Sequence, residues 1–254
     1  MSDLRIAVLV KQVPDPGLVE ISEDGRLMRE NVPAMMDPFG KMALMHAISS
    51  DANVDAVSMG PMQAKDVLYK AMEFGAERSY LISGKEFAGA DTLATAKTLA
   101  SFLNKNGYDL VFCGMQATDG DTAQVPGELS VFMDANIYSY ASSISLDDMT
   151  VTQSYEDREI VSRLELPAVV SFIRPPEGCR QIPSMTDFVR ASDMEIQIIG
   201  AQDCGISILD TGAKGSRTKV KSVSTVMRRR KDTEYIDGSD SNGAAKSILS
   251  EVKE

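Results

Sequence analysis

The sequence predicts an α/β protein with a Rossmann-like, doubly wound and mostly parallel sheet. Residues 4–10 form a nearly continuous apolar run, which is typical of a strand covered on both faces. Further strand-like runs follow at 54–60, 79–83 and 110–114, and the segments between the later runs carry apolar residues three and four positions apart. Strands and helices in alternation imply right-handed crossovers and helices on both faces of a parallel sheet.

The first part of the chain carries signals for a turn and a helix start. Acidic residues and a glycine at 23–25 predict a hairpin turn within residues 19–28. Asp37 stands directly before Pro38, so a capping side chain precedes proline at the first position of a predicted helix, which continues over 39–49.

The next two helices have clear ends. The first stops at Gly75, and the second begins at the capping residue Asp91 and stops at Gly107. The apolar stripe of the first helix consists of Ala64, Val67, Leu68, Ala71 and Met72.

The pattern changes beyond Asp134, where four short strand-like runs follow one another through turns. We expect these runs to extend the sheet. They lie at 138–146, 150–154, 160–164 and 168–173.

Sustained periodicity is lost from about Ser192 onward. We therefore expect an α/β domain over residues 1–191 and a C-terminal arm over residues 192–254. The arm is expected to end in a short helix at 244–252 and to become ordered by wrapping around a partner chain.

Composition argues against several classes of function. The chain has 26 basic and 37 acidic residues, and its net charge of −11 disfavours attraction to nucleic acid or anionic lipid. The three cysteines are widely spaced and form no CxxC motif, which predicts neither a disulfide framework nor a metal site and favours a reduced, cytoplasmic compartment. The one histidine, His46, lies in a predicted helix without a nucleophile motif, which favours a structural role. No run approaches the roughly 20 apolar residues of a membrane helix.

The segment that follows residues 110–114 carries the strongest functional signal. At this place in a doubly wound sheet, a turn containing glycine can direct free backbone N–H groups at a phosphate. Gly114 and Gly120 would let the backbone approach a ligand, and the Thr122 hydroxyl would donate to a phosphate oxygen. An ordinary capped turn explains the spacing equally well, because the segment is neither GxGxxG nor a Walker loop.

Other turns should converge on the same edge of the sheet and favour a nucleotide site there. They follow the strands at 4–10 and 54–60 or begin the helix at Pro38. Lys11 would supply a positive charge beside a phosphate or flavin, with a solvated lysine as the alternative. The residues predicted to contact a nucleotide or flavin are Leu9, Val10, Lys11, Asp37, Pro38, Phe39, Met59, Gly60, Gly114, Gln116, Asp119, Gly120, Asp121, Thr122, Ala123, Gln124 and Val125. The two acidic members of the turn, Asp119 and Asp121, are expected to face ribose hydroxyls or to cap backbone amides.

Several segments occur in the order found in electron transfer flavoprotein beta subunits, which the chain resembles over roughly residues 4–225. Their combination is more specific than any one of them. The segments are 11–15 (KQVPD), 29–33 (RENVP), 37–39 (DPF), 58–61 (SMGP), 89–95 (GADTLAT), 119–125 (DGDTAQV) and 166–170 (LPAVV).

The resemblance implies an alpha/beta heterodimer in which this chain binds an adenine nucleotide and the alpha subunit holds an electron-shuttling FAD. Segments 12–15 and 120–125 resemble signatures of the electron-bifurcating members, which bind a second FAD in the beta subunit. By resemblance, NADH would deliver a hydride to that FAD. One electron would go to a low-potential acceptor such as ferredoxin, and the other would pass through the alpha FAD to an FAD-dependent dehydrogenase.

The chain also departs from the family pattern. Met115 replaces the basic residue that usually follows the glycine at position 114. Pro126 and Gly127 reverse the Gly-Pro order that is common at the helix entrance. Residues 174–180 occupy the region of the family's partner-recognition loop but lack its usual sequence. The alternatives are a beta subunit holding structural AMP and a nucleotide-binding regulatory module without electron transfer. A hydrolase or synthetase acting on an adenine nucleotide is disfavoured, because the chain has no Walker lysine.

Overall fold

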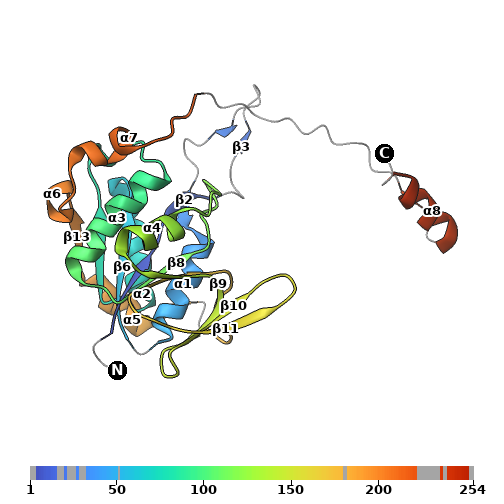
Figure 1. Cartoon of the computed structure of the whole chain (residues 1–254), viewed down its shortest axis with the longest axis horizontal. Helices are drawn as coiled ribbons and strands as arrows, with labels where there is room; N and C mark the ends of the chain where they lie inside the picture. The colour runs from blue at the N-terminus through green and yellow to red at the C-terminus, as the bar shows by residue number, and fades with distance from the viewer. Residues whose placement is uncertain are drawn as a thin grey trace.

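The computed structural model describes residues 4–15, 20–21, 27–28, 33–50, 52–179, 182–221, 235–236 and 239–251. A nine-stranded sheet forms the centre of the molecule (Figure 1). Its strands, from one edge to the other, are β11 (Glu159–Arg163), β10 (Thr150–Ser154), β9 (Asn136–Ser145), β12 (Ala168–Phe172), β8 (Leu110–Gly114), β1 (Arg5–Leu9), β6 (Asn53–Met59), β7 (Arg78–Ile82) and β13 (Ile196–Ile199).

Neighbouring strands are parallel from β9 across β12, β8, β1, β6 and β7 to β13, and β10 and β11 add an antiparallel edge. The predicted α/β fold with a mostly parallel sheet is therefore confirmed. The predicted extension of the sheet beyond Asp134 is also confirmed. Strand β12 lies between β8 and β9, however. After β8 the chain therefore forms β9, β10 and β11 at one side of the sheet and then returns to insert β12 next to β8.

Helices cover both faces of the sheet. One core contains α1 (Pro38–Ile48) and α2 (Lys65–Phe74), while the opposite core contains α3 (Thr92–Asn106) and α4 (Val125–Met133). In β1, Ile6 and Val8 face the first core and Ala7 faces the second, as the period of two in a strand requires. Both faces of β1 are buried, which explains its continuous apolar sequence.

The predicted helix ends are present. Asp37 accepts hydrogen bonds from the backbone N–H groups at the start of α1, and Asp91 does the same for α3. Gly107 ends α3 with φ 64°, a left-handed conformation that glycine adopts without steric penalty.

Short elements complete the described chain. Strand β2 (Gln12–Pro14) pairs with β5 (Ala34–Met36), and β3 (Glu20–Ile21) pairs with β4 (Leu27–Met28). The β3–β4 pair agrees with the predicted hairpin, whose turn at 23–25 lies outside the described residues. The remaining elements are η2 (Met62–Ala64), η3 (Lys85–Phe87), α5 (Met185–Ser192), α6 (Ala201–Cys204), η4 (Ile208–Asp210), α7 (Gly212–Gly215) and α8 (Ser241–Glu251).

The C-terminal part differs from the sequence-based boundary. Strand β13 pairs with β7 and belongs to the main sheet, so the sheet extends past residue 191. Four residues are too few for a periodic pattern, which explains why this strand was not predicted. Helix α8 agrees with the predicted terminal helix and stands apart from the sheet and its covering helices (Figure 1).

Candidate functional site

Three turns meet at the carboxyl edge of the sheet around one buried carboxylate. Asp37 is 1% exposed. Its backbone N–H donates to the carbonyl of Lys11 at 2.8 Å, which ties α1 to the turn after β1. Its Oδ1 accepts from the N–H groups of Phe39 and Gly40 at 2.9 and 3.4 Å. Its Oδ2 accepts from the backbone N–H and the hydroxyl of Thr118 at 2.7 and 2.8 Å, which ties α1 to the turn after β8.

An ion pair crosses the same edge. Lys11 Nζ lies 2.6 Å from Asp119 Oδ1, and the two side chains are 47% and 35% exposed. The sequence predicted Lys11 beside a phosphate or flavin and Asp119 beside a ribose hydroxyl or an amide. In the structure the two side chains contact each other. The ammonium group is therefore held at the turn and remains accessible to a ligand arriving from solvent.

The absence of a side chain at Gly114 has a structural cause. A Cβ at this position would lie 2.5 Å from Phe39 Cβ and 2.6 Å from the Phe39 carbonyl carbon. The start of α1 therefore occupies the space that the sequence analysis assigned to an approaching ligand. Gly120 is different, because a Cβ there meets no atom of a described residue within 4 Å.

The turn after β8 presents exposed backbone. Residues 118–124 are exposed, and Asp121 and Ala123 adopt φ 51° and 53°, which is uncommon for residues other than glycine. The Asp121 N–H donates to the carbonyl of Ala117 at 2.8 Å. The N–H groups of Gly120 and Thr122 form no backbone hydrogen bond with another described residue. Free N–H groups in such a turn can receive an anion.

Helix α4 begins where this turn ends. The hydroxyl of Thr92, at the start of α3, lies 2.9 Å from Gln124 Oε1 and 3.1 Å from Glu128 Oε1. The first turns of α3 and α4 are thus held together beside the exposed backbone. The predicted contact Gln124 faces Thr92, and Val125 is the first residue of α4.

Three buried oxygens have no hydrogen-bond partner among the described residues: Glu128 Oε2 in the first turn of α4, and Gln12 Oε1 and Ser58 Oγ near the strand ends. Ser58, 1% exposed, lies directly before Met59 at the end of β6. Gln12 pairs in register with Met36, next to Asp37. Buried polar atoms normally have a partner, so the oxygens of Gln12 and Ser58 fit a polar ligand. Both fall within segments that the sequence analysis singled out, but neither was predicted as a contact, because burial of a side-chain oxygen has no sequence signal.

The predicted residues are therefore gathered at one edge. Lys11 contacts Asp119, Asp37 contacts Phe39 and is bonded to the turn containing Gln116, and Gly114 packs against Phe39. The end of β6 lies next to the end of β1, which brings Met59 and Gly60 to the same edge as Leu9 and Val10.

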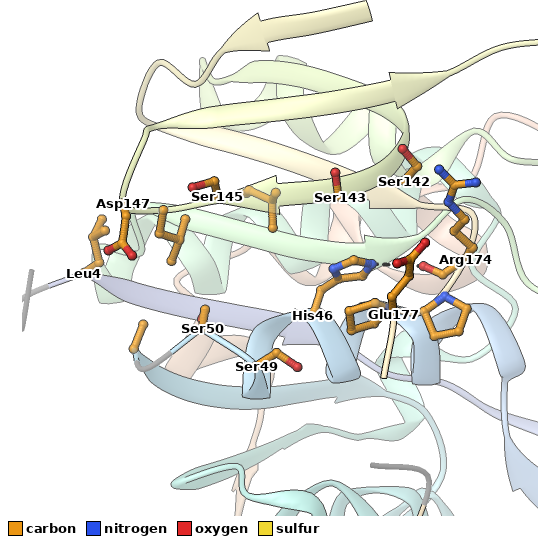
Figure 2. Close-up of a pocket in the computed structure, with 15 residues that line it drawn as sticks. Leu4, His46, Ser49, Ser50, Ser142, Ser143, Ser145, Asp147, Arg174 and Glu177 are labelled. Carbon is orange, nitrogen blue, oxygen red and sulfur yellow. Dashed lines mark hydrogen bonds between the residues drawn. The ribbon is translucent and has the colours of Figure 1, made fainter. Parts of the chain in front are cut away.

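A cavity of about 580 Å³ lies elsewhere, between α1, the second half of β9 and the residues after β12 (Figure 2). Its serine hydroxyls are largely used within the protein. Ser49 donates to the Met45 carbonyl at 2.7 Å and Ser50 to the Ala47 carbonyl at 2.6 Å. The cavity therefore offers few free donors, and the exposed turn remains the better candidate site.

His46 lines this cavity and has a structural environment, as predicted. Its ring stacks on Phe172 with centroids 4.0 Å apart. Its Nε2 lies 2.9 Å from the Arg174 carbonyl (Figure 2). The pKa of His46 is lowered to about 4, because burial disfavours the charged ring; the hydrogen bond to the carbonyl opposes this shift and the Arg174 charge adds to it. The neutral ring therefore donates Nε2–H to the carbonyl.

Within the described ranges, no group of three or more His, Cys, Asp and Glu side chains is placed to hold a metal ion. A helix both long and apolar enough to cross a bilayer is likewise absent from that part of the chain.

Comparison with known proteins decides the family. A family model described as "Electron transfer flavoprotein domain" matches residues 24–175. The chain belongs to the electron transfer flavoprotein family. Its similarity to beta subunits extends over almost the whole chain. The electron transfer flavoprotein subunit beta of Clostridium acetobutylicum is 36% identical over 258 residues, covering 99% of this chain and 98% of that protein.

Two further relatives carry other names. The caffeyl-CoA reductase-Etf complex subunit CarD of Acetobacterium woodii is 34% identical over 261 residues, covering 99% of this chain and 98% of CarD. Protein FixA of Azorhizobium caulinodans is 32% identical over 265 residues, covering 98% of this chain and 94% of FixA. The electron transfer flavoprotein beta-type sequence therefore occurs under several functional names.

Proposed function

We propose that this chain is the beta subunit of a cytoplasmic electron transfer flavoprotein heterodimer and that it binds FAD for NADH-dependent electron bifurcation. The observation that carries the proposal is the exposed turn at 118–124, held against the strand ends by Asp37 and Lys11. Family membership and the similarity to CarD support it. The resemblance of segments 12–15 and 120–125 to bifurcating members favours FAD over AMP.

The residues at the edge fit a dinucleotide. The N–H groups of Gly120 and Thr122 and the Thr122 hydroxyl would hold phosphate oxygens, and Lys11 would balance their charge. The unpartnered oxygens of Gln12 and Ser58 would receive polar groups of the ligand. Bound FAD would supply the chemistry of hydride acceptance and one-electron transfer. The role of this chain is to orient the flavin and to exclude water from it.

The proposed partners follow from the same resemblance. They are an electron transfer flavoprotein alpha subunit, an FAD-dependent dehydrogenase and ferredoxin. The name of CarD places that relative in a complex with a caffeyl-CoA reductase. We propose an analogous dehydrogenase partner for this chain, and a wrapping role around the alpha subunit for the C-terminal arm.

The flavin content of the heterodimer tests this proposal. The chain is coexpressed with an electron transfer flavoprotein alpha subunit, the heterodimer is saturated with FAD and denatured, and the released FAD and AMP are counted. We expect two FAD and no AMP per heterodimer, and bleaching of the flavin absorbance by NADH under anaerobic conditions. One FAD and one AMP, with no bleaching, would assign the chain to the non-bifurcating class. Two FAD without bleaching would retain the cofactor and reject NADH as the donor.

A further inference from the structure

We propose that Asp37 is a positioning residue that sets the shape of the nucleotide-binding turn and does not itself contact the nucleotide. This inference rests on the proposed function in one respect, since it takes the turn at 118–124 to be the binding element. It changes the role of a residue that the sequence analysis predicted as a direct contact.

The carboxylate of Asp37 has no free capacity for a ligand. An ionised carboxylate has about four lone-pair sites. Four donors already approach it: the N–H groups of Phe39, Gly40 and Thr118, and the Thr118 hydroxyl. The side chain is also almost fully buried. A nucleotide hydroxyl would have to displace one of these donors to reach it.

The same bonds fix the turn in space. Thr118 is held by Asp37, 81 residues earlier, and the adjacent Asp119 is held by Lys11, 108 residues earlier. Lys11 is in turn joined to Asp37 through its carbonyl. Thr118 and Asp119 are therefore both tied to the strand-end turn before α1. Left-handed residues such as Asp121 and Ala123, which follow directly, persist only where the surroundings hold them.

The negative charge of Asp37 lets an electrostatic role be distinguished from a positioning role. A carboxylate beside an anion-binding turn disfavours phosphate by Coulomb repulsion. The change Asp37→Asn removes that negative charge and retains a side chain that is a good helix cap. On electrostatic grounds alone, nucleotide retention should rise. If Asp37 acts by positioning the turn, nucleotide retention should fall, because the new amide group would point its N–H donors at the backbone N–H of Thr118.

The test compares Asp37→Asn and Thr118→Val with Thr98→Val in the complete heterodimer. Thr98 is buried in α3 and its hydroxyl donates to the Ala94 carbonyl at 2.7 Å, so Thr98→Val is a matched loss of a hydroxyl away from the turn. We expect nucleotide dissociation to be at least about tenfold faster in Asp37→Asn and a few-fold faster in Thr118→Val. Thr98→Val should leave it unchanged, and Thr118→Ser should restore the wild-type rate.

A second readout does not depend on nucleotide. Endoproteinase Asp-N can cut before Asp119 and Asp121, so cleavage there in nucleotide-free protein reports whether the turn is held. We expect faster cleavage in Asp37→Asn and Thr118→Val than in wild type or Thr98→Val. Unchanged cleavage in both turn variants would overturn the positioning role. A wild-type heterodimer without any adenine nucleotide would instead overturn the proposed function, and the cleavage rates would still decide the role of Asp37. If Asp37→Asn does not fold, the nucleotide dissociation and cleavage rates of Thr118→Val and Thr118→Ser test the positioning role.

Discussion

Thr218 donates its backbone N–H and its hydroxyl to Asp91 Oδ2 at 2.9 and 3.0 Å, across 127 residues of chain. The N–H of Arg217 donates to the same oxygen at 2.7 Å, while Oδ1 caps α3 through the N–H of Ala94. Burial alone would raise the pKa of Asp91, but the hydrogen bonds from Ala94, Thr218 and Arg217 outweigh it and lower the pKa. The start of α3 therefore anchors residues 217 and 218, which lie within the predicted arm.

Replacing Asp91 should loosen this anchor. Asp91→Asn keeps a capping oxygen for α3 but lacks the second acceptor for Arg217 and Thr218, so we expect faster trypsin cleavage after Arg217 and Lys219 in the isolated chain. Asp203→Asn is the matched control, because among the described contacts the Asp203 side chain accepts a hydrogen bond from the nearby Gly200 N–H and reaches no distant segment. Equal cleavage of wild type and Asp91→Asn would contradict the anchor. Since the folded pKa is lowered, the anchor is complete above the ordinary pKa and should weaken as pH falls through the folded value.

Gly114→Ala should destabilise the protein. The added methyl group would lie 2.5 Å from Phe39 Cβ, and backbone atoms of α1 surround the same point, so the helix start must shift. We expect a loss of about 1–3 kcal/mol in the free energy of unfolding, measured with denaturant. Gly127→Ala is the control, since its methyl group meets no atom within 4 Å of the described structure and alanine favours a helix. Gly114→Ala with wild-type stability would show that the packing at Phe39 is looser than the distances indicate.

Gly120→Val tests the placement of the phosphate. Its side chain enters open space, so we expect a folded protein with wild-type thermal stability. Nucleotide content should nevertheless fall several-fold, because a branched side chain would obstruct the approach of phosphate to the backbone N–H groups. Gly200→Val, in the loop before α6, supplies the same change at a distant site with room for a side chain. If Gly120→Val retains full nucleotide, the phosphate lies elsewhere.

His46 should make stability depend on pH. Its folded pKa of about 4 lies below the ordinary value of 6.5, so the unfolded chain binds the proton first as pH falls. Stability should therefore decrease from about pH 6.5 toward pH 4, with a slope approaching 1.4 kcal/mol per pH unit. The slope between pH 7 and 5 should be reduced in His46→Gln. Because the sequence has one histidine, its NMR signal also reports the folded pKa directly, and a value near 6.5 would exclude this effect.

The order of elements was predictable because each signal is local. Asp37 before Pro38 marks a helix start, and Gly107 marks a helix end, by the chemistry of a few neighbouring residues. The gathering of candidate residues at one edge also followed, since parallel strands end on the same side. The position of β12 between β8 and β9 did not follow, because strand order depends on contacts between distant segments.

The side-chain partners at the site had no sequence signal. Lys11 and Asp119 each allow several roles, and only the fold shows that they face each other. Asp37 was predicted both as a cap and as a nucleotide contact, and its bonds to Thr118 favour the positioning role. Gly114 was assigned to ligand approach because a sequence cannot distinguish space for a ligand from space for a neighbouring helix.

Strand β13 sets a limit on how the molecule can be shortened. It covers the N–H and C=O groups of β7 that would otherwise form the outer edge of a parallel sheet. A polypeptide cut before residue 196 would leave β7 open to pairing with other chains and should form aggregates, which light scattering would detect. A shortened chain should therefore keep residues 196–199, and it should extend through Thr218 to retain the contact with Asp91.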